Sequence, residues 1–490
     1  RGSRALRRRC PRGLGRVDAD RLTSFDHRGG MWKDAVPSRP DEERPVQFAP
    51  HTDADVHHML DMLGLGSLDE LFDHIPDSVR VGDTIDLPDG LAEEEVVRHL
   101  QALAARNRGA DLVCFAGGGA YDHYVPALIP AILSRGELYT SYTPYQPEVS
   151  QGVLQALFEY QTVICQLTGL DVSNASLYDG ASAAAEAVNM ALAATDRQGV
   201  VVSGGLAPGT REVVRTFAHP RTLDVTEAPL DDDGRTHVPR LGEGTGAYLL
   251  SQPNHLGVVE DVRAHARAAH AVGARLVVSF DATAAGLLAR PGDQDADLVV
   301  GDGLQLGNAL QFGGPSFGFL AARLKEVRGL PGRLVGETVD ARGHRGFVLT
   351  LQAREQHIRR EKATSNICTN QTLNALAGLL YLVWLGPDGL RELASTCLQR
   401  AHDLARRLAA VDGVHLAVTA PFFKEFPLRV PGDPDAFVAA VAEEGYLVGP
   451  VVRDGPAAGA VLVAATERRT AAEADGLTQA VARAAKEAGA

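Results

Sequence analysis

The feature that most constrains the fold is an alternation, between residues 150 and 327, of short apolar runs with amphipathic helical segments. The runs are rich in β-branched residues and nearly continuous in apolar side chains, which is typical of strands covered on both faces. We expect strands at 200–203, 221–225, 247–250, 276–280, 298–300 and 318–321, and helices at 153–167, 181–194, 210–218 and 262–272. Residues 150–330 are therefore predicted to form a large doubly wound α/β domain with a parallel or mixed sheet.

The remainder of the chain divides into four further parts. Residues 1–48 are rich in arginine and chain breakers, and we expect a disordered extension or an upstream start-site artefact. Residues 49–149 predict an N-terminal helical arm with loops, with one helix capped by Thr52 and a capping box at Ser67 and Glu70. Beyond the large domain we expect connecting helices over 331–408 (at 350–360, 371–384 and 390–408) and a small α+β domain over 409–490.

Composition excludes several classes of protein. A net charge of -14 argues against a nucleic-acid partner, because phosphate-binding surfaces are basic. The five cysteines are scattered and form no C-x-x-C pair, which argues against a structural metal site and favours a reducing, cytoplasmic location. The longest apolar runs are interrupted by glycine, so we expect no membrane-spanning segment.

A large α/β domain followed by a small α+β domain is the layout of many pyridoxal-phosphate (PLP) enzymes. That chemistry requires an acid for the ring nitrogen, a Schiff-base lysine and an anion site for the phosphate. Asp281 follows the strand expected at 276–280, where it is either the ring-nitrogen acid or an ordinary helix cap. The turn 177–182 opens a helix whose free N–H groups suit an anion.

The lysines are the more informative test. The chain has five, namely Lys33, Lys325, Lys362, Lys424 and Lys486. We expect a Schiff-base lysine in the loop 301–307, but this loop contains Leu304 and Gln305 instead. Lys325 begins a segment with the composition of a solvated surface. The sequence thus has the scaffold of a PLP enzyme and lacks its nucleophile.

Several long segments resemble the P-protein of the glycine cleavage system, and in particular its separately encoded first subunit. They are YTSYTPYQPEVSQG (139–152), NASLYDG (174–180), FGGP (312–315), PGR (331–333), GETVD (336–340) and REQHIRREKATSNICT (354–369). The resemblance extends from about His51 to the C-terminus and implies the fold-type-I PLP-transferase fold. In that family the half of the enzyme similar to this chain lacks the cofactor lysine, which agrees with the lysine positions.

The resemblance also implies a function and its partners. The chain would be subunit 1 of a heterotetrameric glycine dehydrogenase (aminomethyl-transferring), inactive alone. A second subunit would carry PLP, decarboxylate glycine and pass the aminomethyl group to the lipoyl arm of the H-protein. Two alternatives stay open: a self-sufficient PLP lyase or transferase using Lys325 or Lys362, and a purely structural binder with this fold.

Two segments are candidates for a shared active-site cleft or a subunit interface. The loop 142–148 combines aromatic rings, an amide and an acid with two prolines, and the polar run 354–366 carries four cations. The run 354–366 also reads as an exposed helix with i, i+4 pairs between Glu355 and Arg359 and between His357 and Glu361, which leaves His357 structural. The candidate residues are Tyr142, Thr143, Tyr145, Gln146, Glu148, Arg354, Arg359, Lys362, Ser365 and Asn366.

Two further features carry weaker expectations. The triplet Gly117-Gly118-Gly119 lets backbone approach a ligand or another chain closely. For His123 and His255 a stacking role on a cofactor ring is the alternative, and ordinary packing is the favoured interpretation.

Overall fold

The computed structural model describes residues 50–80, 87–311 and 313–489, so the extension expected over 1–48 lies outside the described residues. The chain divides into two compact units, one ending at Val96 and the other running from Val97 to the C-terminus. The arm expected over 49–149 is therefore divided, and its second half belongs to the same unit as the α/β domain.

The first unit contains short helices. Helix α1 (Asp53–Leu63) is capped by Thr52, as its sequence indicates, and Thr52 also forms a capping box with Asp55. The capping box expected at Ser67 and Glu70 is wrong, because the 3₁₀ turns η2 (Asp69–Phe72) and η3 (Asp77–Val79) have no side-chain cap. The Glu70 carboxylate instead accepts a hydrogen bond from the backbone N–H of Gly66. Helix α2 (Glu93–Ala104) spans the boundary between the units.

A seven-stranded mixed sheet forms the large domain, in the order β2-β8-β7-β6-β5-β3-β4. The five strands β7, β6, β5, β3 and β4 are parallel to one another. Strand β8 is antiparallel to both of its neighbours, β7 and β2. The strands are β2 (Val172–Ser173), β3 (Gly199–Ser203), β4 (Asp224–Ala228), β5 (Thr245–Gln252), β6 (Arg275–Phe280), β7 (Leu298–Asp302) and β8 (Gly318–Ala322).

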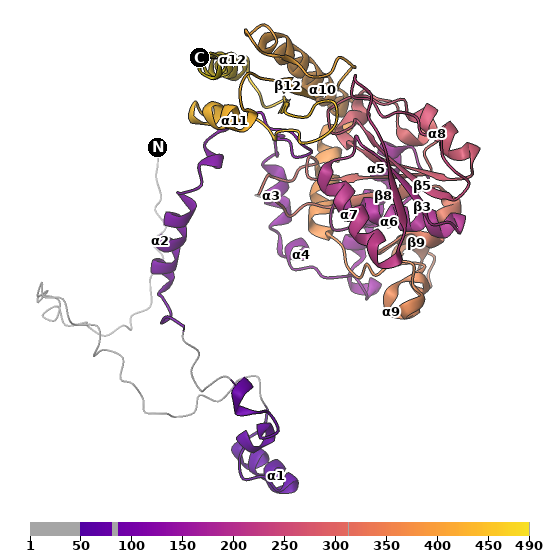
Figure 1. Ribbon diagram of the computed structural model, residues 1–490. Helices are drawn as coiled ribbons and strands as arrows, with labels where there is room; N and C mark the ends of the chain where they lie inside the picture. Colours follow the sequence, from indigo (N-terminus) through magenta and orange to yellow (C-terminus); the bar gives the residue numbers. More distant parts are fainter. Residues whose placement is uncertain (1–49, 81–86, 312, 490) are drawn as a thin grey trace, which may run out of the picture. The chain divides into compact units, whose positions relative to one another are not determined.

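Helices cover both faces of this sheet, as expected for a doubly wound domain (Figure 1). Side chains alternate along β5. Tyr248 and Leu250 face a core shared with α5 (Gln151–Thr168) and α8 (Val262–Ala271). Ala247 and Leu249 face a second core formed with α6 (Gly180–Thr195) and α7 (Pro208–Ala218). Both faces of the central strands are dry, which explains their nearly continuous apolar sequences.

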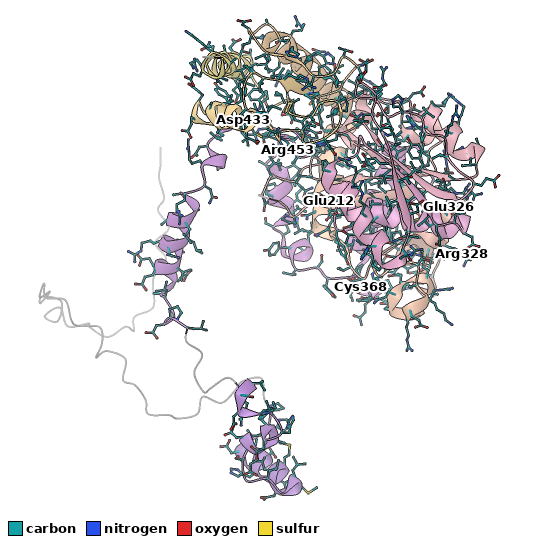
Figure 2. All side chains as sticks on the ribbon, in the orientation of Figure 1. Glu212, Glu326, Arg328, Cys368, Asp433 and Arg453 are labelled. Carbon is teal, nitrogen blue, oxygen red and sulfur yellow. The ribbon has the colours of Figure 1, made fainter. Side chains whose placement is uncertain are left out.

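The connecting region differs most from expectation. Before the first expected connecting helix lies β9 (Val335–Val339), which pairs in antiparallel fashion with β10 (Arg345–Leu349). The helix expected at 350–360 is wrong, because only the short turns η10 (Gln352–Arg354), α9 (Gln356–Arg359) and η11 (Arg360–Lys362) form there. Arg360 has a φ of 56°, which interrupts a helix. Cys368, beyond these turns, is exposed (Figure 2).

The two helices expected at 371–384 and 390–408 both form within α10 (Thr372–Leu408), and non-helical backbone at Gly386, just before Pro387, separates them. A proline inside a helix removes a hydrogen bond and clashes with the preceding turn, which explains the break. Among the described residues, α10 is the one helix that meets the length and composition of a membrane span. Its first half lies in the core of the large domain, with Ala375, Leu379 and Tyr381 buried.

The small C-terminal domain is α+β, as expected. The sheet β11-β12-β14 is antiparallel and is accompanied by two helices (Figure 1). The elements are β11 (His415–Leu416), β12 (Glu425–Arg429), β14 (Val461–Ala464), α11 (Pro434–Glu443) and α12 (Ala471–Ala488). The domain also receives a segment from far upstream, because β1 (Val113–Cys114) pairs in parallel with β13 (Tyr446–Leu447).

Candidate functional site

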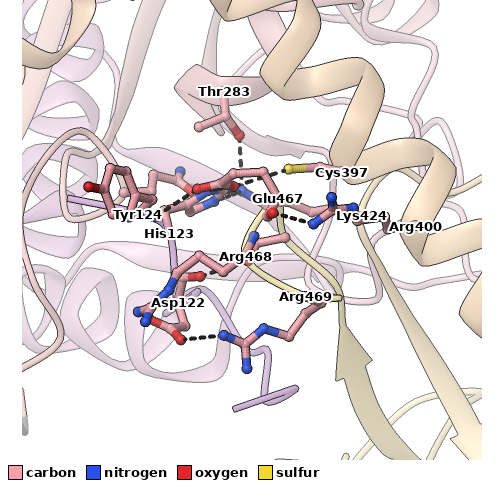
Figure 3. A network of polar contacts seen from close by, with 12 residues as sticks. Asp122, His123, Tyr124, Thr283, Cys397, Arg400, Lys424, Glu467, Arg468 and Arg469 are labelled. Atoms are coloured by element: carbon pink, nitrogen blue, oxygen red, sulfur yellow. Dashed lines mark hydrogen bonds and ion pairs between the residues drawn. The ribbon is translucent and has the colours of Figure 1, made fainter. Parts of the chain in front are cut away.

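A buried lysine lies where the large and small domains meet. Lys424 immediately precedes β12 and is 1% exposed. Its Nζ atom lies 2.8 Å from Oδ2 of Asp281, 2.9 Å from Oγ1 of Thr283 and 2.7 Å from Oε1 of Gln305 (Figure 3 shows its place in the network). Charge-assisted hydrogen bonds of this kind are the strong ones in a protein interior.

Asp281 has the capping role that its sequence position suggests, and it also pairs with Lys424. It follows β6 and caps the 3₁₀ turn η7 (Ala282–Gly286), with Oδ1 accepting from the backbone and hydroxyl of Thr283. Its other oxygen faces Lys424. Burial alone raises the pKa of this carboxyl, but the charge of Lys424 and the hydrogen bonds outweigh burial and lower it. Asp281 is therefore held as an anion at the C-terminal edge of the sheet.

Gln305 lies in the loop after β7, where a Schiff-base lysine is expected. Its amide oxygen accepts from Lys424, and the side chain is buried. Lys325 and Lys362 are exposed, as expected for Lys325 from its surroundings in the sequence. Of the lysines in the described ranges, Lys424 is the one with a buried side chain.

His123 joins this cluster to a second acid and is not a simple packing residue. Its Nε2 atom lies 3.1 Å from Nζ of Lys424, and its Nδ1 atom lies 2.7 Å from Glu467 (Figure 3). Burial, followed by the charge of Lys424, lowers the pKa of His123. Cys397 lies 3.6 Å from Glu467, and burial raises the pKa of its thiol to about 12. Although these three residues offer ligand atoms within 4.8 Å of one another, the atoms are engaged in hydrogen bonds.

The glycine triplet 117–119 packs against Glu425, the residue after Lys424. The Glu425 carboxylate accepts hydrogen bonds from the backbone N–H of Gly118 and from the hydroxyl of Tyr121. A Cβ atom on Gly117 would lie 1.8 Å from Oε1 of Glu425, so only glycine fits there. Burial raises the pKa of Glu425 to about 7. The Tyr121 ring in turn covers Lys424, with Nζ 4.0 Å from the ring centroid. The triplet thus approaches a buried side chain of its own chain.

The turn 177–182 is already occupied by carboxylates. Asp179 caps α6, accepting from the backbone N–H of Ser182 at 2.7 Å. The backbone N–H of Gly180 donates to Oδ2 of Asp302 at 2.9 Å, and Asp302 also accepts from Leu304 and Ser316. Negative side chains are favourable at a helix N-terminus, so these acids stabilise α6. The N–H groups of this turn therefore bind carboxylates of the protein itself, those of Asp179 and Asp302.

Arg333 connects the two candidate segments, the loop 142–148 and the run 354–366. This buried guanidinium donates to the hydroxyl of Tyr145 at 2.7 Å, stacks over the Tyr145 ring at 5.1 Å and pairs with the buried Glu355. Glu355 is 4% exposed and paired with Arg333, so it does not form the expected exposed pair with Arg359. Arg354 lies beside this cluster and donates to the carbonyls of Leu330 and Gly332.

The other candidate residues lie at or near the surface. Tyr142 is 79% exposed, and Gln146, Glu148, Arg359, Lys362 and Asn366 are exposed. Thr143 and Ser365 are half-buried. His357 is exposed, with Nδ1 3.9 Å from Glu355. His255 is half-buried, and burial lowers its pKa to about 4. The structure therefore connects Tyr145 with the run 354–366, while the Lys424 cluster is built from other residues.

Comparison with known proteins identifies the family. The sequence profile described as glycine cleavage system P-protein matches residues 46–481. The chain belongs to the glycine cleavage system P-protein family. A relative from Carboxydothermus hydrogenoformans, named probable glycine dehydrogenase (decarboxylating) subunit 1, is 48% identical over 89% of this chain and 99% of its own length. A relative of the same name from Moorella thermoacetica is also 48% identical, over the same shares.

Solved structures agree with this assignment. The crystal structure of glycine decarboxylase (P-protein) of the glycine cleavage system, in inhibitor-bound form, is 47% identical, with a TM-score of 0.82 over 89% of this chain and 99% of that chain. A sphingosine-1-phosphate lyase from Burkholderia pseudomallei is 14% identical, with a TM-score of 0.62 over 84% of this chain and 95% of that chain, and shows the fold alone. This member of the P-protein family therefore has the fold of the fold-type-I PLP enzymes.

The residues in the cleft of this P-protein chain do not fit PLP. In PLP enzymes the Schiff-base lysine and the acid for the ring nitrogen bind opposite ends of the pyridine ring, so the ring separates them. Here Lys424 and Asp281 are in direct contact. At the other end, two N–H groups that would meet a phosphate are taken by Asp179 and Asp302.

Lys424 is not among the site residues expected from the sequence, in which the loop 301–307 is the expected place for a lysine. One signal was present: two adjacent charges, Lys424 and Glu425, interrupt an otherwise apolar run from 421 to 428. Charged residues are rarely buried unless they are paired, so charges inside a predicted strand indicate buried partners. The identity of those partners, which come from three distant segments, was not readable from spacing.

Proposed function

We propose that this chain is subunit 1 of a two-subunit glycine decarboxylase of the glycine cleavage system, acting in the cytoplasm. Its partner is a homologous second subunit that carries PLP on a lysine. Together they decarboxylate glycine and transfer the aminomethyl group to the lipoyl arm of the H-protein. Relatives named as subunit 1 support the subunit role, and the four free cysteines of the described residues suit a reducing compartment.

One observation carries the dependence on a partner. The loop position where PLP chemistry requires a lysine holds Gln305, and the amide of Gln305 is bound by Lys424. Lys424 cannot take over the missing role while it contacts Asp281, because no ring fits between them. The nucleophile must therefore come from a second chain.

We infer that the loop 142–148 and the run 354–366 form the surface that meets this partner. The loop exposes aromatic and apolar side chains, with Tyr142 79% and Val149, just beyond it, 80% exposed. The run exposes Ile358 together with Arg359 and Lys362. Exposed aromatics with arginines are the composition of interface hot spots. Arg333 fixes both segments from beneath through Tyr145 and Glu355, so the surface is held in one arrangement.

Reconstitution tests the proposed function. The purified chain should show no glycine decarboxylation and no visible band of a pyridoxal Schiff base. Addition of the PLP-bearing second subunit and lipoylated H-protein should produce both. An isolated chain that decarboxylates glycine, or that yields a reduced pyridoxyl-lysine after borohydride treatment and peptide mapping, would contradict the proposal.

A matched pair of substitutions tests the surface. Tyr142→Ala should weaken assembly and lower the reconstituted rate, because it removes an exposed aromatic ring from the proposed contact. Phe217→Ala, on α7, removes another exposed ring (41% exposed) outside these segments and should change neither. Complex formation is measured by analytical ultracentrifugation and the rate by release of CO2 from glycine. A Tyr142→Ala chain that assembles and turns over like the unmodified chain would refute this surface.

A further inference from the structure

We propose that this chain fills its own cofactor cleft, with Lys424 standing in for a cationic ring beside Asp281 and with Asp179 and Asp302 standing in for a phosphate at the start of α6. The proposal concerns the chain's interior. It shares the contact between Lys424 and Asp281 with the proposed function, and its tests measure stability and ligand binding rather than glycine decarboxylation.

At the Lys424 end, every N–H donor of the ammonium group has an oxygen acceptor. An ammonium group has three N–H donors, and the Nζ atom of Lys424 has three oxygen acceptors within 2.9 Å. A fourth polar contact, with His123, is longer at 3.1 Å. The Tyr121 ring covers the group from a further direction. Asp281 consequently has a full positive partner within the chain, and the ammonium group of that partner is buried.

At the start of α6, two backbone N–H donors likewise already have carboxylate acceptors. The N–H groups of Gly180 and Ser182 point to carboxylate oxygens of Asp302 and Asp179. Asp302 is itself fixed by the hydroxyl of Ser316 and the N–H of Leu304. A phosphate arriving at this turn would meet two carboxylates of its own sign, which oppose it electrostatically. A Cβ atom on Gly180 would lie 2.8 Å from Cβ of Asp302, so the approach of Asp302 requires glycine.

The cleft therefore supplies both charges of a bound cofactor from its own side chains. These contacts are made by the chain's own buried and half-buried groups, and removal of one member leaves its partner unpaired. If Lys424 is truncated, the remaining cavity ends on the Asp281 carboxylate. The ligand class that fits this cavity is a small primary ammonium ion.

Chemical rescue tests the cationic end in the full-length chain. Lys424→Ala should lower the thermal midpoint by several degrees, and ethylammonium chloride should restore part of that loss while sodium chloride at equal ionic strength should not. The double variant Asp281→Asn, Lys424→Met should melt above Lys424→Ala, because neither partner is then left charged and alone. Lys325→Ala, which removes an exposed lysine, should melt like the unmodified chain with or without ethylammonium.

The double variant keeps the test decisive if Lys424→Ala does not fold. A folded double variant beside an unfolded single variant supports the pair. Equal instability of both, or a Lys424→Ala chain as stable as the unmodified one, overturns the proposal. Pyridoxine 5′-phosphate tests both ends together, since it has no aldehyde and cannot label surface lysines. It should leave the midpoint of the unmodified chain unchanged, and saturable stabilisation by it would also overturn the proposal.

Discussion

The ammonium nitrogen of Lys424 lies 2.8 Å from Oδ2 of Asp281, and the two residues come from different domains. Asp281 directly follows β6, a central strand of the large sheet, and Lys424 directly precedes β12, the middle strand of the small one. Buried ion pairs require exact geometry because their desolvation is costly. The pair therefore specifies how the small domain meets the large one in addition to filling the cleft.

A second buried pair makes a prediction about stability. Arg333→Met should reduce the free energy of unfolding by about 3–5 kcal/mol, because it leaves Glu355 charged and unpaired in the interior. The double variant Arg333→Met, Glu355→Met should recover much of this loss. Arg345→Ala breaks an exposed pair with Glu337 and should cost about 0–1 kcal/mol. Urea unfolding measures all three, and equal losses for Arg333→Met and Arg345→Ala would contradict the prediction.

The raised pKa of Glu425 predicts that the free energy of unfolding falls as the pH rises. The folded state holds its pKa at about 7, above the usual 4.5, so the folded chain binds more protons than the unfolded chain between these values. The free energy of unfolding should therefore decrease across that window, by at most about 3 kcal/mol from this group. Glu425→Gln cannot titrate and should lack this component. Urea unfolding across the window tests it, and identical slopes for both chains would argue against the assignment.

The lowered pKa of His265, a buried residue on α8, predicts that the free energy of unfolding rises with pH. Burial lowers its pKa from 6.5 to about 4, so the folded chain binds fewer protons than the unfolded chain in that range. Its contribution is complete above pH 6.5 and is lost as the pH falls toward 4. His265→Phe should remove this loss, although it also deprives the buried Tyr248 hydroxyl of its partner, at a cost of about 1–3 kcal/mol. The slope of stability against pH, rather than its absolute value, is the informative measurement.

Gly180 predicts a steric effect at the start of α6. Gly180→Ala places a methyl group 2.9 Å from the backbone nitrogen of Asp302 and should destabilise the chain by about 1–3 kcal/mol. Gly209→Ala, in the first turn of α7, meets no atom within 4 Å and should be neutral or stabilising by about 0.5–1 kcal/mol. Thermal unfolding of the two variants compares a crowded with an open glycine. A Gly180→Ala chain as stable as Gly209→Ala would show that Asp302 yields easily.

The large domain was predictable because its signals are local. Apolar runs separated by amphipathic helices determine the strands to within a few residues, and Thr52 and Asp281 both cap as their positions suggest. The strand expected at 221–225 begins instead at Asp224, because η6 (His219–Arg221) prolongs the preceding helix and Thr222 has a φ of 50°. Such endings depend on backbone detail that composition does not encode.

The errors have a different origin. The run 354–366 has the charge spacing of an exposed helix, but Glu355 finds a better partner in Arg333. The Lys424 cluster likewise draws its members from a loop, two strand ends and a segment before the large domain. Partners this distant in sequence are determined by the tertiary fold, so no local pattern predicts them. The lysine positions predict that this chain lacks a Schiff-base lysine, but they give no indication that Lys424 contacts Gln305.

The parallel pairing of Val113 and Cys114 with Tyr446 and Leu447 bears on how the polypeptide can be divided. The small domain is discontinuous, since one of its strands is made long before the rest of it. During synthesis this early strand must wait for nearly the whole polypeptide before its edge is paired. A fragment starting at residue 150 would leave the backbone of Tyr446 and Leu447 without that neighbour, so dissection of this protein should keep both segments together.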